Sequence, residues 1–258
     1  MKKDYIKIFF IPFMLFFILF PIFMLIINID MNGISKILKD QYFLYSITNT
    51  LIAGMVASTI SIIFALGFGY YHLFFKDTFY YKLINVINEL PVVLPHTVAG
   101  LALLLAFGRN TMGFISNTGL AFSFGALVIG MVFVSYPFAA RALSSSIGLI
   151  DENIINVART LGDSPQEVYF KIVIPHIKKS LISAFLLSFS RTISEFAVLM
   201  IFAGNIPRKT QVISSYVFTK IEEGEIELAI TASVFSLIFS LILICLMNVI
   251  EGRSKKNA

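Results

Sequence analysis

Six apolar stretches, each long enough to cross a lipid bilayer, restrict this chain to a membrane protein. They cover residues 6–29, 46–75, 83–107, 120–143, 180–203 and 228–250. A transmembrane helix needs about 20 predominantly apolar residues, and continuous runs argue against the alternating pattern of a transmembrane β-barrel. Charged residues make up 14% of the chain, against about 25% in soluble domains. The sequence predicts an all-α membrane protein with six transmembrane helices in one domain, residues 1–258.

The basic residues that flank these stretches predict the orientation of the chain. Most fall on one side: at both termini, in the 76–82 connection and in the 144–179 loop, with Arg141 counted among them. Cytoplasmic connections carry an excess of Lys and Arg, so we expect both termini and the 144–179 loop in the cytoplasm. A basic inner face suits anionic lipid headgroups. The net charge of +5 therefore requires no nucleic-acid partner.

The polar loop between the fourth and fifth stretches predicts two short helices joined by a sharp turn. Asp151 is a suitable N-cap for the first helix, and Gly162 can adopt the left-handed conformation that ends it. Ser164-Pro165-Gln166-Glu167 predicts a capping box with proline in the first turn of the second helix, and Pro175 should stop or kink that helix. Four apolar residues share one face of the first helix: Ile154, Val157, Ala158 and Leu161. Such a protrusion either enters a partner's groove or lies on lipid headgroups.

The residues of this loop resemble the EAA loop of permease subunits of binding-protein-dependent ABC importers. Asn156-Val157-Ala158 stands at the Glu-Ala-Ala element, Gly162 at the glycine, and Ile172-Val173-Ile174-Pro175 at the closing Ile-x-Leu-Pro, with both spacings kept. Asn156, Val157 and Ile174 depart from the family's residues. The resemblance implies a coupling helix, residues 154–161, that docks on a cytoplasmic ATPase. It assigns this coupling to Asn156, Val157, Ala158, Arg159, Leu161, Gly162, Ile172 and Pro175.

Two prolines, Pro91 and Pro95, should break the third predicted span at its start. Backbone groups freed at membrane depth are tolerated only where protein or a water-filled cavity satisfies them. His96 and Thr97 follow the break directly. His96 can donate to an anion there, or it can be a satisfied interfacial residue near the inner face.

The fifth predicted span carries two opposite charges, Arg191 and Glu195, four residues apart. Charge at the bilayer centre costs about 2.5–3.5 kcal/mol on insertion scales, and opposite charges at this helical spacing can neutralise each other. They either mark a transport pathway, together with Ser194, or form an ion pair that only locks helices together.

The surrounding residues are similar to the molybdate/tungstate branch of these permeases. The similarity rests on residues 91–95 and 97–100, on Ser194-Glu195-Phe196 and on residues 202–211, and it extends over residues 83–250. It implies an ATP-driven importer that moves a tetrahedral oxyanion, tungstate or molybdate, across the cell membrane by alternating access. Implied partners are a second copy of the chain, a cytoplasmic ATPase dimer that holds ATP and Mg²⁺, and an external oxyanion-binding protein. The candidate pathway residues are His96, Thr97, Arg191, Ser194 and Glu195.

Two other functions stay open. Sulfate/thiosulfate permeases share much of the pattern, and an ion-coupled secondary transporter could use Arg191 and Glu195 as a relay. An enzyme is not expected, because the chain has one cysteine, Cys245, no HExxH motif and no complete P-loop. We expect no cofactor or metal in this chain.

An acidic run follows the fifth span, comprising Glu222, Glu223, Glu225 and Glu227. Such a run is either a solvated face or a contact for the external binding protein. It should not bind the oxyanion, which it would repel.

Overall fold

The computed structural model describes residues 5–255, with side-chain surroundings for residues 10–250. Within that range the chain is all-helical, as predicted, and the one β contact is an isolated bridge between Gly108 and Gly119. The helices in chain order are α1 (Tyr5–Ile27), α2 (Met31–Lys39), α3 (Gln41–Phe75), α4 (Phe79–Val93), α5 (His96–Phe107), α6 (Arg109–Met112), α7 (Phe124–Ile147), α8 (Glu152–Thr160), α9 (Pro165–Val168), the π-helix Tyr169–Val173, α10 (Ile174–His176), α11 (Lys178–Ile193), α12 (Ala197–Phe202), α13 (Ile213–Glu222) and α14 (Ile226–Lys255).

Among the residues that the structure describes, four helices are long and apolar enough to cross a bilayer: α1, α3, α7 and α14. Two bent pairs in the same range bring the number of candidate spans to six if each pair is counted as one span. In one pair, the chain bends by 113° between α4 and α5. In the other, it bends by 75° between the segments Pro165–His176 and Lys178–Ile193. The third predicted span, residues 83–107, is therefore not one helix. The fifth, residues 180–203, is also interrupted, because α11 ends at Ile193 and α12 begins at Ala197.

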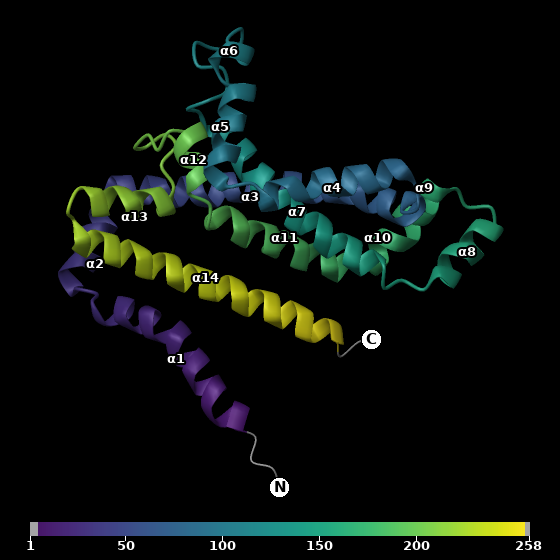
Figure 1. Ribbon diagram of the computed structural model, residues 1–258, viewed down its shortest axis with the longest axis horizontal. Coiled ribbons are helices and arrows are strands. Elements are labelled where there is room, and N and C mark those ends of the chain that lie inside the picture. Colours follow the sequence, from purple (N-terminus) through teal and green to yellow (C-terminus); the bar gives the residue numbers. More distant parts are fainter. Residues whose placement is uncertain (1–4, 256–258) are drawn as a thin grey trace.

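The centre of the bundle consists of α3, α7 and α11, which lie alongside one another (Figure 1). Close approach of α3 and α11 depends on Gly54, since a Cβ there would lie 2.8 Å from Thr192 Oγ1. Ser61 of α3 and Ser135 of α7 share a buried hydrogen bond of 2.9 Å. Small residues let helix backbones approach in this way when lipid supplies no hydrophobic driving force.

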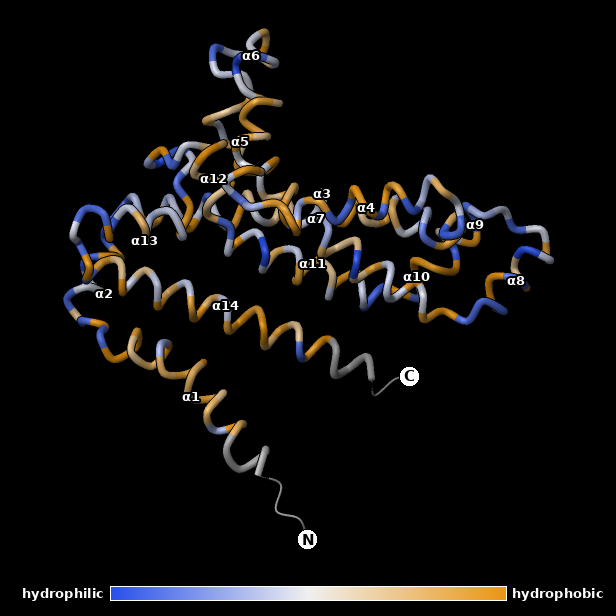
Figure 2. The backbone as a smooth tube through the Cα atoms, viewed as in Figure 1, coloured by the Kyte–Doolittle hydropathy of each residue, from blue (hydrophilic) through white to orange (hydrophobic). Residues whose placement is uncertain are grey.

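Helices α5 and α6 project away from this bundle, whereas α14 and α1 lie on another side of it (Figure 1). Hydrophobic residues follow the long helices, and hydrophilic residues gather at the two ends of the bundle, around α8 and around α2 and α13 (Figure 2). Two polar ends separated by an apolar middle are the pattern of a protein that spans a membrane.

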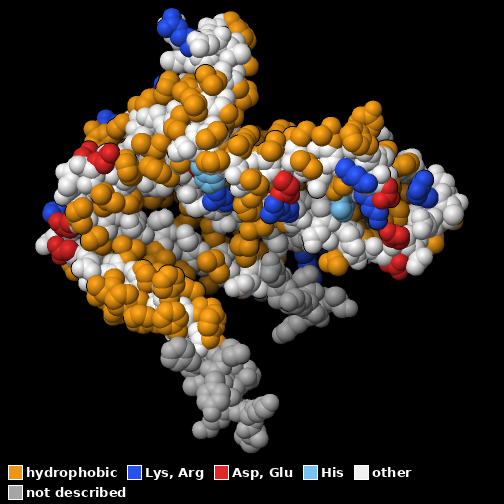
Figure 3. Space-filling view, in the orientation of Figure 1, with side chains coloured by type: hydrophobic (Ala, Val, Ile, Leu, Met, Phe, Trp, Pro, Cys, Tyr) orange, Lys and Arg blue, Asp and Glu red, His pale blue; other side chains and the backbone are white. Residues whose placement is uncertain are grey.

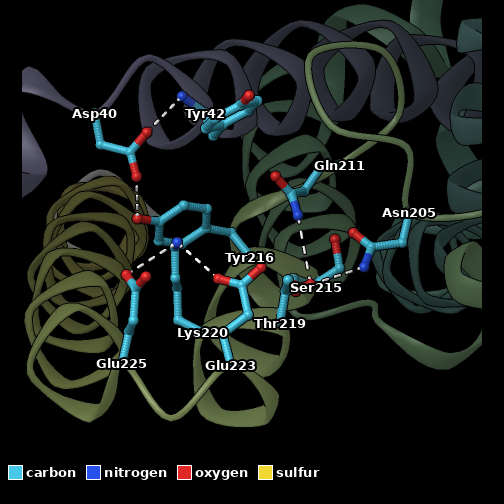
Figure 4. Close-up of polar contacts among 10 residues, drawn as sticks. All are labelled: Asp40, Tyr42, Asn205, Gln211, Ser215, Tyr216, Thr219, Lys220, Glu223 and Glu225. Atoms are coloured by element: carbon cyan, nitrogen blue, oxygen red, sulfur yellow. Dashed lines mark hydrogen bonds and ion pairs between the residues drawn. The ribbon is translucent and has the colours of Figure 1, made fainter.

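The acidic run lies at the end of the bundle that carries α2 and α13, and most of its charge is paired. Glu223 and Glu225 contact the Lys220 ammonium at 2.8 and 3.1 Å (Figure 4), and Glu227 contacts Lys36 at 2.9 Å. Beside them, buried Tyr216 donates to Asp40 Oδ2 at 2.7 Å. Burial and this bond to a carboxylate raise the pKa of Tyr216 above its ordinary value. This end is thus a network of ion pairs.

Candidate functional site

The loop predicted to couple to an ATPase folds as its capping residues dictate. The backbone N–H of Asn153 donates to Asp151 Oδ1 at 2.9 Å, so that Asp151 caps α8. Gly162, with φ at +102°, reverses the chain just after α8, a conformation that favours glycine. Ser164 and Glu167 form the predicted capping box: each backbone N–H donates to the other residue's side chain, at 2.9 and 3.3 Å.

The prediction for Pro175 is only partly right. Pro175 does not end the helical segment, because it lies in the first turn of α10, and the 75° bend follows at Ile177. The turn directly before α10 is the π-helix Tyr169–Val173. Proline has no backbone N–H, so the turn before it already lacks one α-helical hydrogen bond. A π-turn at this place therefore sacrifices fewer hydrogen bonds than it would within a regular α-helix.

The predicted apolar face of α8 is divided between the protein interior and the surface. Ala158 is buried, and it packs with Ile155 against a core cluster that includes α7 and the π-helix. Val157 and Leu161 instead stay exposed, at 57% and 82%, as does Ile154. All three leave apolar surface open on the outer side of α8. One side of α8 therefore packs on the protein core, and the other side is exposed.

The remaining predicted loop residues lie close to this helix. Asn156 and Arg159 border a cavity of about 250 Å³ between α8 and the end of α3, where His72 and Lys76 also contribute. Ile172 packs, partly buried, on the core cluster beneath α8. The loop prediction therefore corresponds to one compact structure at one end of the bundle (Figure 1).

Two helix breaks bring together three of the predicted pathway residues. His96 follows the break between α4 and α5, Glu195 lies in the break between α11 and α12, and Arg191 stands in the last turn of α11. Arg191 Nη2 lies 2.9 Å from His96 Nε2, and His96 Nδ1 lies 3.2 Å from Glu195 Oε2. Because a guanidinium only donates, His96 Nε2 accepts and the proton of a neutral ring sits on Nδ1, facing the carboxylate. We call these three residues the ion cluster.

Glu195 is the most enclosed member of the ion cluster. Its side chain is 0% exposed, and its Oε1 accepts from the backbone N–H of Val198, in the first turn of α12, at 3.0 Å. Oε2 lies 3.7 Å from Arg191 Nη2. Burying a carboxylate is unfavourable unless it is paired and hydrogen-bonded; here Oε1 is hydrogen-bonded, whereas Oε2 has two cationic or polar neighbours but no hydrogen bond. The sequence predicts Arg191 and Glu195 on one face of a continuous helix. In the structure α11 ends at Ile193, and Glu195 contacts Arg191 from the segment between α11 and α12.

The other two predicted pathway residues contribute unequally. Arg191 Nη1 donates to Ser194 Oγ at 3.3 Å, so that Ser194 borders the ion cluster. Thr97 is exposed in the first turn of α5. The break beside His96 was expected at the start of the third span, near the inner face. Instead the 15-residue helix α4 precedes it, and both interpretations of His96, anion donor and satisfied interfacial residue, stay predictions.

Sequence reasoning missed a second ion pair between charges in separate apolar helices. Arg141 of α7 donates from Nε to Glu89 Oε1 of α4 at 2.9 Å, and its Nη2 contacts Glu89 Oε2. The sequence places Arg141 near the end of the span 120–143 and counts it among the basic residues of the cytoplasmic side, yet α7 continues to Ile147. The available signal was one lone acid and one lone base in two apolar stretches, since such charges pair with each other.

Comparison with known proteins gives the family. Residues 61–256 match the family described as binding-protein-dependent transport system inner membrane component. A probable transport system permease protein NifC of Clostridium pasteurianum is 34% identical, over 88% of this chain and 82% of its own. The molybdate/tungstate transport system permease protein WtpB of Pyrococcus furiosus is 29% identical over 82% and 83%. A probable sulfate transport system permease protein cysT of Anthoceros angustus is 32% identical over 85% and 78%.

The fold has a counterpart among solved structures. A chain of a bacterial ABC transporter involved in the import of the acidic polysaccharide alginate superposes with a TM-score of 0.70, at 17% identity, over 96% of this chain and 94% of that one. At that identity the likeness concerns the fold alone. The family match covers residues 61–256, which is most of the chain. This chain therefore belongs to the binding-protein-dependent inner membrane components, the permease subunits of ABC importers.

Proposed function

We propose that this permease moves a tetrahedral oxyanion, molybdate or tungstate, and that the ion cluster lines its pathway. The observation that carries the proposal is the placement of Arg191 and His96, two anion-binding groups, at two helix breaks inside apolar spans. The Arg191 side chain is 26% exposed, so an anion can reach it. Charged residues inside membrane helices mark transport pathways by default, and relatives named for molybdate/tungstate transport support the choice of anion.

Glu195 sets the strength of this site. Its carboxylate faces the same guanidinium and imidazole that would receive the oxyanion. An incoming anion must displace or outweigh that contact, so Glu195 keeps anion binding weak. Weak binding suits a transporter, because an anion held tightly inside the membrane would leave slowly.

ATP hydrolysis would occur on a separate cytoplasmic ATPase dimer, which holds ATP and Mg²⁺ and onto which α8 docks. Support comes from the outward surface of α8, where Val157 and Leu161 are exposed on a helix that is capped at its start and turned sharply at its end. Helices that offer apolar anchors in this way fit into partner grooves. Two copies of the chain would enclose the pathway, with the α8 end in the cytoplasm and the α13 end facing the external binding protein.

Transport in liposomes tests the proposal. The permease is reconstituted with the ATPase and binding protein encoded beside it, and uptake of tungstate, molybdate and sulfate is measured in competition. We expect uptake that requires ATP and prefers tungstate or molybdate. A preference for sulfate, which the relative named for sulfate transport makes the second candidate, would change the substrate and keep the transport class. Uptake driven by an ion gradient without ATP would contradict the proposal.

Docking of α8 is tested by Leu161→Ser, with Ile221→Ser as the matched control. Both leucine and isoleucine side chains are exposed, at 82% and 52%, but Ile221 lies in α13 at the opposite end of the bundle. We expect Leu161→Ser to reduce co-purification of the ATPase and Ile221→Ser to leave it unchanged. Equal loss in both variants would contradict a docking role for α8.

A further inference from the structure

The Arg141–Glu89 pair is more exposed than an ion pair that only holds two membrane helices together needs to be. The Arg141 side chain is 53% exposed and that of Glu89 is 29% exposed. Arg141 lies six residues before the end of α7, about 9 Å along the helix at 1.5 Å per residue. A guanidinium half-exposed to hydrocarbon is costly, whereas one exposed to water is not. An aqueous space beside this pair would remove that cost.

The same face carries the ion cluster. The Arg191 guanidinium lies 5.6 Å from the ring centre of Phe138, and Phe138 precedes Arg141 on α7 by three residues, which places both on one side of that helix. Glu89 belongs to α4, the helix that leads through the break into His96. In the space-filling view, Lys/Arg, acidic and histidine side chains follow one another across a largely hydrophobic face (Figure 3).

The two sites also share one chemical arrangement. In each, a guanidinium inside the apolar region is matched by a carboxylate, Glu195 for Arg191 and Glu89 for Arg141. Carboxylates and tetrahedral oxyanions bind a guanidinium in the same way, through two parallel N–H···O bonds. A carboxylate can therefore occupy the anion-binding position of the guanidinium until an oxyanion displaces it.

We propose that Arg141 is a second oxyanion-binding position, nearer the α8 end than Arg191, with Glu89 as its counter-ion when no anion is bound. This inference rests on the proposed function, since it requires an oxyanion to pass. Two weak positions in series would let an anion move from one guanidinium to the next without crossing an uncharged apolar stretch. Glu89 would limit the affinity of the inner position as Glu195 limits that of the outer one.

The first test is Glu89→Gln, with Glu227→Gln as the matched control. Glu227 also pairs with a cation, Lys36, and its side chain is 34% exposed, close to the 29% of Glu89, but it lies at the opposite end of the bundle. Retention of tungstate and of molybdate is measured by equilibrium dialysis on the purified permease–ATPase complex, without binding protein. We expect Glu89→Gln to raise affinity roughly twofold to fivefold, the range that an exposed ion pair contributes, and to slow maximal uptake.

Adding Arg141→Gln to Glu89→Gln should abolish this gain, whereas the control should match the wild type. Unchanged retention in Glu89→Gln, in a complex whose wild type transports the anion, would overturn the inner position and leave the proposed function standing. A wild-type complex that transports no oxyanion at all would overturn the proposed function itself.

A second measurement keeps both ion pairs intact, in case Glu89→Gln does not assemble. Phe138→Cys is made with Cys245→Ser, which removes the single native cysteine. We expect a water-soluble anionic thiosulfonate to modify Cys at position 138 faster than a cationic one. Sodium tungstate, but not sodium chloride of equal ionic strength, should slow the reaction. Absence of reaction, or equal rates for both reagents with no effect of tungstate, would show that this face is not an anion path.

Discussion

Replacing Gly162 with alanine isolates the conformational requirement of the loop from its packing. The φ of Gly162 is +102°, and a Cβ added there would meet no atom within 4 Å. The only cost is then that of the backbone conformation, about 1–2 kcal/mol for an L-residue forced into the left-handed region. Two backbone bonds depend on this turn: Gly162 N–H to Arg159 O at 3.1 Å and Asp163 N–H to Ala158 O at 3.2 Å.

Because about 1.4 kcal/mol corresponds to a factor of ten in an equilibrium constant, opening of this turn should increase about tenfold in Gly162→Ala. Hydrogen exchange followed by mass spectrometry, on the permease–ATPase complex in nanodiscs, should show correspondingly faster exchange of the amides at 161–163. If α8 transmits ATPase motion, ATP-dependent uptake should fall with it, while membrane insertion stays normal.

Two glycines provide matched controls for Gly162→Ala. A Cβ at Gly67, inside α3, also meets nothing within 4 Å, but the backbone there is helical, so Gly67→Ala should leave exchange in the loop unchanged. Gly224, with φ at +77° and equally open surroundings, lies at the α13 end. Gly224→Ala should carry the same strain and leave coupling intact. Unchanged exchange in Gly162→Ala, or the same loss of uptake in Gly224→Ala, would refute the reasoning.

Three further substitutions test the packing and capping of the chain. Ser164→Ala removes the cap of α9 and should cost about 1 kcal/mol of local stability, seen as faster amide exchange at Glu167, whereas Ser164→Asp should restore it. Tyr216→Phe removes the 2.7 Å bond to Asp40 and should lower the free energy of unfolding by about 1–2 kcal/mol, with uptake unchanged. Gly54→Ala places a methyl group 2.8 and 2.9 Å from two side chains of α11 and should cost about 1–3 kcal/mol; a raised thermal midpoint in detergent, as helix propensity alone predicts, would contradict this packing.

Local signals in the sequence were enough to place the loop. Asp151, Gly162 and the Ser164–Glu167 pair act on backbone groups within a few residues, and each fulfils its predicted part. The face of α8 was harder, because apolar spacing does not say which of two adjacent faces the protein itself will cover. Ala158 turned inward and Leu161 outward. The docking role of these residues stays a prediction.

The number of membrane spans could be predicted from nearby residues, whereas the breaks within them could be predicted only in part. Their number and apolar character follow from length and composition, because a bilayer requires about 20 apolar residues for each helix. Their continuity does not follow from these properties. The break at Leu94 and Pro95 was signalled by proline, but the break between α11 and α12 carries neither proline nor glycine.

The class of this protein, its helical composition and the caps of its polar loop all follow from the order of its residues, because hydropathy and capping act over short stretches of chain. Which charges meet depends instead on how the helices pack. His96 lies 95 residues from Arg191, and Glu89 lies 52 residues from Arg141. A charge in a membrane helix requires a partner, but packing and helix breaks choose that partner, because they decide which faces of distant helices come within hydrogen-bond distance.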